Sequence, residues 1–157
     1  MKKQLLIIVI LFGSITLSFG QDYENAIGLR GGLYNGVTFK HFLGESSAVE
    51  AMLFTRWNGF AVSALYEIHS YTAFDVPRLN WYYGIGGHVG LFDGTYVSWL
   101  DNTVATMVIG VDAILGIEYN FEEIPINISL DYKPAFNLIG DVGFWGDGGA
   151  FSIRYLF

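Results

Sequence analysis

The chain has 157 residues, of which 52% are hydrophobic and 17% aromatic, and its formal net charge at pH 7 is −7. An acidic chain of this size is a poor nucleic-acid binder, because that affinity comes largely from Lys and Arg at phosphates. The chain has no Cys, which excludes a disulfide framework and a lipid-anchored cysteine. Its length corresponds to one domain.

The N-terminus predicts a secretory signal peptide. A charged start at Lys2 precedes an apolar stretch at residues 5–12, and Ser18 to Gly20 form the expected cleavage region. The apolar stretch is shorter than the ~20 residues of a membrane-spanning helix. We expect residues 1–20 to be removed after export through the inner membrane, and residues 21–157 to form the mature domain.

The mature chain divides into segments that alternate apolar and polar residues. A period of two is that of a β-strand with two different faces, and turn-rich breaks separate the segments. Pro134 lies in the seventh segment, where its missing N–H favours the outer rim or a bulge. The predicted strands are residues 26–34, 36–43, 47–56, 60–71, 79–92, 103–120, 126–138 and 149–157.

Eight strands predict an all-β fold, namely an eight-stranded antiparallel transmembrane β-barrel with up-and-down topology. An even number of strands places both termini on the periplasmic side. The last strand, GAFSIRYLF, shows the pattern most clearly and ends on an aromatic at the terminal carboxylate. One face carries Arg154, and the other is apolar apart from the hydroxyl of Tyr155.

Sorting each strand by face confines the charges to one side. The other side is predicted to contact lipid, where a Lys or Arg near the membrane midplane costs ~2 to 4 kcal/mol. The predicted outward set includes Ile27, Leu29, Val37, Phe39, Val49, Ala51, Leu53, Val62, Ile68, Trp81, Tyr83, Ile85, Val89, Met107, Ile109, Val111, Leu115 and Ile117. The predicted inward set contains Arg30, Lys40, Glu50, Glu67, His69, His88, Asp112, Glu118, Asp131, Lys133 and Arg154.

The inward set nearly neutralises itself, with four fixed cations and five carboxylates. An eight-stranded barrel has an interior just wide enough for side chains to fill. We therefore expect a plugged lumen that is cross-linked by ion pairs and has no continuous pore. The alternative is a soluble two-sheet protein whose charged face contacts water.

The segment GIGGHVG at residues 84–90 is not a dinucleotide-binding motif. Val89 stands where that motif needs a third Gly, and no helix is predicted to follow. We instead expect Gly84, Gly86 and Gly90 to let the strand curve and to leave space for rings such as Tyr82.

The residues predict no catalytic, metal or cofactor site. The three His residues lack the close spacing of metal ligands. Ser63, Glu67 and His69 supply the residue types of an acyl-transfer site, but their strand descends toward the periplasm, away from an outer-leaflet substrate. A lipid- or lipopolysaccharide-modifying enzyme and a narrow channel are the alternative functions.

Three segments carry a family resemblance: LNWYYGIGGHVG (79–90), LDYKPAFNL (130–138) and SIRYLF (152–157). With the signal peptide and the charged lumen, they resemble the small outer-membrane barrels of the OmpX type and of the OmpA transmembrane domain. They are also similar to uncharacterised outer-membrane barrel proteins of Bacteroidota. The resemblance implies a bacterial outer-membrane location, contact with membrane lipid and lipopolysaccharide, and recognition by the barrel-assembly machinery through the strand ending at Phe157.

The expected function is that of a non-enzymatic surface barrel. The predicted strands 79–92 and 103–120 exceed the ~9 to 11 residues that span a membrane, so their outer ends are expected to project as a hairpin around residues 93–102. An exposed strand edge can pair with the backbone of an extracellular partner. We therefore expect a role in envelope integrity or in surface interaction and adhesion.

Overall fold

The computed structural model describes residues 23–56, 59–71, 75–92 and 106–157. Within these ranges no helix is long and apolar enough to cross a membrane. The predicted signal peptide and the predicted hairpin tip at residues 93–102 lie outside the described residues.

The described part of the chain consists of strands and the turns between them. In chain order the strands are β1 (Asn25–Gly32), β2 (Asn35–Phe42), β3 (Ser47–Arg56), β4 (Gly59–Ser70), β5 (Leu79–Phe92), β6 (Thr106–Asn120), β7 (Ile126–Tyr132), β8 (Ala135–Ile139), β9 (Gly143–Trp145) and β10 (Gly149–Leu156). Alternating apolar and polar residues along each long strand explain this architecture, because such a strand needs two different environments on its two faces.

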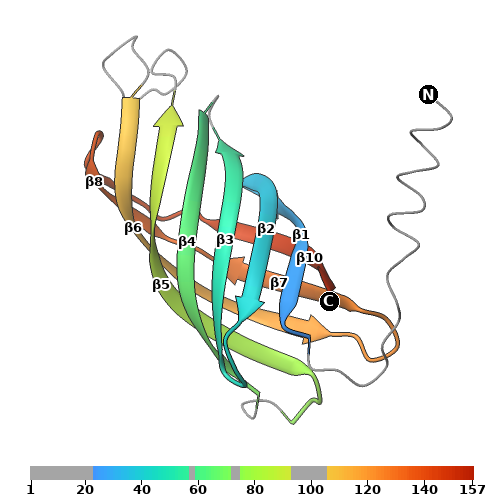
Figure 1. The fold of residues 1–157 in the computed structure, drawn as a ribbon. Coiled ribbons are helices and arrows are strands. Elements are labelled where there is room, and N and C mark those ends of the chain that lie inside the picture. The colour runs from blue at the N-terminus through green and yellow to red at the C-terminus, as the bar shows by residue number, and fades with distance from the viewer. Residues whose placement is uncertain (1–22, 57–58, 72–74, 93–105) are drawn as a thin grey trace, which may run out of the picture.

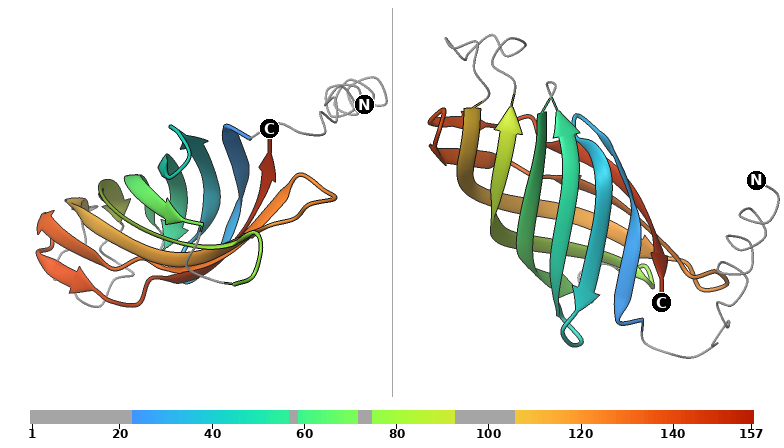
Figure 2. Two further views of the ribbon diagram at one scale, coloured as in Figure 1. Left: turned by 90° about the horizontal axis from the view of Figure 1, so that it is seen from below. Right: turned by 45° about the horizontal axis from the view of Figure 1, so that its top comes forward.

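Eight of these strands close into an antiparallel barrel, as predicted. Each strand from β1 to β6 pairs with the strand that follows it in the chain, so the pairing runs without a gap from β1 to β7. β7 then pairs with β10, and β10 pairs with β1, which closes the ring. Figure 1 shows the tilted strands of the wall, and the right-hand view of Figure 2 shows β2, β3 and β4 in front of β7 and β10. Asn25 N donates to Phe157 O at 3.0 Å, so both described ends of the chain lie at one end of the barrel. We call it the terminal end and the opposite one the far end.

The predicted seventh strand is interrupted, so its prediction as one continuous segment is wrong. β7 ends at Tyr132, and β8 begins at Ala135 but remains paired with β6, with a register shift between Ile109 and Gly110. The break falls at Pro134, which has no N–H to donate to a neighbouring strand. β9 turns back on β8 inside the predicted loop 139–148, so this hairpin adds to the far end of the ring.

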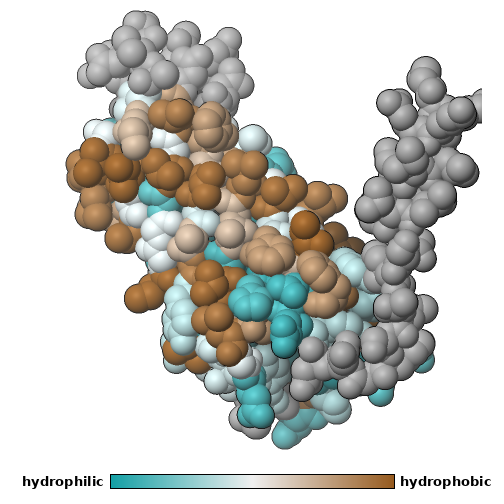
Figure 3. Space-filling model, in the orientation of Figure 1, coloured by the Kyte–Doolittle hydropathy of each residue, from teal (hydrophilic) through white to brown (hydrophobic). Residues whose placement is uncertain are grey.

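The two faces of the wall differ as the sequence predicts. Every residue of the predicted outward set is exposed or half-buried, and the exposed fraction reaches 72% at Ile85. Among the described strands, no Asp, Glu, Lys or Arg points outward. Figure 3 shows apolar side chains as a band across the upper half of one face. The exterior of the wall is thus apolar, and the charges are inside.

Small residues on the inner face make room for the large polar side chains. A Cβ atom added at Gly84 would approach Glu67 Cγ to 3.0 Å. Gly90 leaves space for a ring as predicted, because a Cβ atom there would lie 2.7 Å from Phe92 Cε2. The ring of Tyr82 lies against a further glycine, Gly116 of the next strand. A Cβ atom at Gly116 would lie 2.6 Å from Tyr82 Cζ and 2.7 Å from Asp131 Cβ.

We predict that Gly116→Ala lowers the free energy of unfolding by about 1 to 3 kcal/mol, because the added methyl group overpacks the interior. Gly143→Ala is the matched control, since nothing lies within 4 Å of a Cβ atom at that position. Urea titration of both variants in the same detergent measures the difference. Equal stability of the two variants would contradict the tight contact between Gly116 and Tyr82.

Candidate functional site: the charged barrel interior

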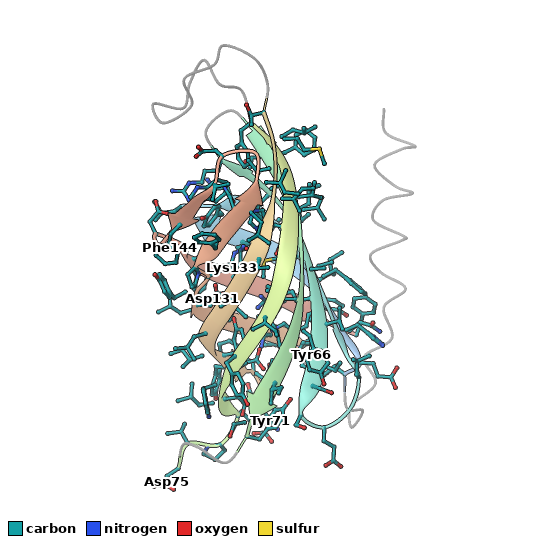
Figure 4. The ribbon with its side chains drawn as sticks, turned by 90° about the vertical axis from the view of Figure 1, so that its left-hand side faces the viewer. Tyr66, Tyr71, Asp75, Asp131, Lys133 and Phe144 are labelled. Carbon is teal, nitrogen blue, oxygen red and sulfur yellow. The ribbon has the colours of Figure 1, made fainter. Side chains whose placement is uncertain are left out.

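The structure places all eleven predicted inward residues inside the barrel, and each is at most 5% exposed. Each one also lies within 4.0 Å of a group of opposite or complementary charge. Figure 4 illustrates the two faces: Asp131 and Lys133 are buried in the lumen, whereas Phe144 and Tyr66 lie on the exterior.

One group of charges fills the terminal end of the lumen. We call it the terminal-end cluster, and it comprises Lys40, Glu50, Glu67, His69, Glu118 and Arg154. Lys40 Nζ lies 2.7 Å from Glu67, 3.6 Å from Glu118 and 3.7 Å from Glu50. Arg154 donates to Glu50 at 2.5 Å. The cluster therefore joins three consecutive strands, β2, β3 and β4, to β6 and β10, which come much later in the sequence.

His69 connects two carboxylates within this cluster. Its Nδ1 lies 3.0 Å from Glu118 Oε1, and its Nε2 lies 3.2 Å from Glu67 Oε2. The imidazole ring stacks on Tyr82, with ring centroids 5.2 Å apart. His69 is therefore held on three sides and presents no ring nitrogen to a substrate.

A forked ion pair crosses the middle of the lumen. The Arg30 guanidinium donates from Nη1 to Asp131 Oδ2 at 2.7 Å and from Nη2 to Asp131 Oδ1. Tyr82 also donates its hydroxyl to Asp131, at 3.1 Å. Two parallel bonds to one carboxylate give both strength and a fixed geometry, so this pair fastens β1 to β7.

A second polar group, the far-end cluster, consists of Ser63, His88, Asp112, Lys133 and Asn137. Asp112 is its centre and accepts from Ser63 at 2.5 Å, with His88 Nδ1 at 2.9 Å and Lys133 Nζ at 3.0 Å. His88 Nε2 contacts Asn137 at 2.9 Å, which ties β5 to β8. All the polar side chains in this cluster thus contact other side chains of the wall.

Aromatic rings close the far end beyond these charges. Tyr34 packs edge-on against Phe54 at 5.1 Å, and Phe92 packs against Trp145 at 5.4 Å. Trp145 also stacks on His88 at 5.7 Å. All four of these aromatic side chains are buried, so the interior becomes an aromatic plug toward the far end.

Arg56 is the one fixed cation of the interior that the predicted set omitted. It donates to the Tyr34 hydroxyl at 2.6 Å and to Asp147 in the turn before β10. The hydrogen bond from Arg56 lowers the pKa of Asp147. The signal was present in the sequence, because Glu50, Arg56 and the residues between them alternate strictly. With Arg56 included, the described interior contains five fixed cations and five carboxylates.

The structure does not bring Ser63, Glu67 and His69 into a catalytic arrangement. Ser63 donates to Asp112, whereas His69 contacts Glu67 and Glu118. A serine nucleophile needs its hydroxyl within hydrogen-bond reach of the base. Among the residues that the structure places, no group of three or more His, Cys, Asp or Glu side chains is arranged to hold a metal ion.

We predict that Lys40→Met destabilises the barrel by about 3 to 5 kcal/mol, because it leaves buried carboxylates without their shared cation. Arg78→Met is the matched control: Arg78 pairs with Glu122 at 3.2 Å on the exposed rim, where a pair contributes about 0 to 1 kcal/mol. Urea unfolding of both variants in one detergent provides the comparison. Similar losses in the two variants would show that the buried network does not stabilise the fold.

No protein-family model matches this chain, and no curated protein matches it significantly. The barrel and its charged interior are thus the features from which a function is inferred.

Proposed function

We propose that this protein is an integral β-barrel of the bacterial outer membrane and that its lumen is closed. We further propose that it supports the envelope and offers a surface for contact with other molecules, and that it is neither a channel nor an enzyme. The observation that carries the proposal is the complete segregation of charge in the described strands. Their Asp, Glu, Lys and Arg side chains face inward, and their exterior is apolar.

This segregation is the reverse of what water favours. A soluble antiparallel sheet turns its polar face to solvent and its apolar face to the core, and monomeric soluble proteins rarely expose apolar patches larger than a few hundred Å². Here many exposed apolar side chains lie on the outer face of the strands, and a groove on that face is lined by Trp81, Leu115, Gly116, Ile117, Leu130, Asp131 and Tyr132. Hydrocarbon is the solvent that matches such a surface.

The positions of the exposed charges support a membrane orientation. Those of the described residues lie in the turns and flanking segments: Glu24, Glu45, Asp75, Arg78, Glu122 and Glu123 at the terminal end, and Asp147 at the far end, where Asp141 is half-buried. Aromatic side chains such as Trp81, Tyr119 and Phe157 lie near the terminal ends of their strands. Polar rims beside aromatic residues are typical of the two membrane–water interfaces.

The packed interior favours a structural role over transport. The terminal-end cluster and the aromatic plug occupy opposite ends of a lumen that an eight-stranded barrel can fill with side chains. Contacts with other molecules are then left to the exterior and the rims. The strand ending at Phe157 is the proposed element for recognition by the barrel-assembly machinery.

Membrane fractionation and bilayer recording test the proposal together. We expect the protein in the outer-membrane fraction, released only by detergent, and we expect faster migration on SDS gels before boiling than after it. We also expect no stable unitary current when the purified barrel is added to a planar bilayer.

Each result has a distinct contrary outcome. Release into the soluble fraction would refute the membrane location, and stable unitary currents would refute the closed lumen. A deletion strain separates the remaining roles: increased entry of a large antibiotic with unchanged lipids supports the envelope role. Altered lipid A or phospholipid would instead identify a lipid-modifying enzyme.

A further inference from the structure

The terminal-end cluster lacks one fixed positive charge. Its three carboxylates, Glu50, Glu67 and Glu118, face two fixed cations, Lys40 and Arg154. Elsewhere in the interior Arg30 pairs with Asp131 and Lys133 pairs with Asp112. Arg56, at the far end, pairs with Asp147 in the turn before β10, whose side chain is 54% exposed. The unmatched negative charge therefore lies around His69.

The geometry of His69 identifies where the missing charge resides. Both ring nitrogens face carboxylate oxygens, at 3.0 Å for Glu118 and 3.2 Å for Glu67. A neutral imidazole has one N–H and one lone pair, whereas an imidazolium has two N–H donors. When Glu67 and Glu118 are both ionised, a neutral His69 would point its lone pair at one carboxylate oxygen, whereas the doubly protonated ring donates to both.

The surroundings of His69 leave no other cation to supply this charge. Lys40 from β2 and Arg154 from β10 are already shared among the carboxylates, while Tyr82 from β5 and Asn127 from β7 are neutral. The side chains of His69, Glu67 and Glu118 have no exposed surface, so bulk water does not screen them. An uncompensated buried charge is costly.

We propose that the interior binds one proton at His69, which is a buried imidazolium clamped between Glu67 on β4 and Glu118 on β6. The proton completes the charge balance of the terminal-end cluster and links two strands across the lumen. This inference rests on the geometry of the interior and is independent of the proposed membrane location.

Nitrogen NMR of the imidazole rings tests the protonation state directly. The barrel in detergent micelles is measured at about pH 7.5, one unit above the ordinary His pKa of ~6.5, and the His69 signal is assigned with His69→Gln. We expect both His69 ring nitrogens to carry protons, whereas the same chain in concentrated urea shows mostly neutral imidazole. A neutral tautomer at His69 in the folded barrel would overturn the proposal.

A charge-restoring pair of substitutions tests the energetic consequence. His69→Gln removes the proposed cation, so we expect the unfolding equilibrium constant to rise on the order of a hundredfold. Adding Glu118→Gln to that variant removes the unmatched carboxylate, and we expect it to recover much of the loss although it breaks another contact. His69→Gln with wild-type stability, or a double variant no more stable than the single one, would refute the charge balance.

Discussion

Compensation of buried charge is the constraint on which the rest of this structure depends. Ten residues with fixed charges lie in the lumen, and almost none of their surface is exposed. Burying any one of these charges without a partner of opposite charge would cost a large amount of free energy. The partners lie on different strands, so satisfying one charge fixes the distance between two parts of the wall. Arg30 with Asp131 and Arg154 with Glu50 each join residues about a hundred positions apart in sequence. The ring of strands and the ion-pair network therefore require each other.

The same constraint explains the apolar exterior and the composition of the interior. Because an eight-stranded ring encloses little space, long polar side chains fit only where a neighbour is small, as Tyr82 does beside Gly116. Most large apolar side chains therefore face outward, whereas a smaller apolar group that includes Phe54, Phe92 and Trp145 fills the far end of the interior. A barrel with ions inside and hydrocarbon-like side chains outside is suited to lipid, and its closed lumen leaves the rims as the surfaces for contact.

The period-two pattern was sufficient to predict the barrel and the facing of its strands, because each residue's face follows from its position along the strand. It could not predict which charges pair, since Lys40 on β2 meets Glu118 on β6 only after the five strands from β2 to β6 have been aligned. Pro134 marked the site of an irregularity in the sequence, but the pattern could not predict that β7 ends at Tyr132 and that β6 takes β8 as a second partner. The inward orientation of Arg56 could have been predicted from the same alternation. The packing of Gly116 on Tyr82 could not, because it depends on the register between two strands.

The central claim is that the exterior contacts lipid, and a single charge on that surface tests it most directly. Ile85 lies midway along β5 and is 72% exposed, whereas Thr55 faces outward near the far end of β3. In lipid vesicles, Ile85→Lys should lower the free energy of unfolding by about 2 to 4 kcal/mol, and Thr55→Lys by about 0 to 1 kcal/mol. Unchanged stability of Ile85→Lys in vesicles would mean that this wall faces water and would contradict the account.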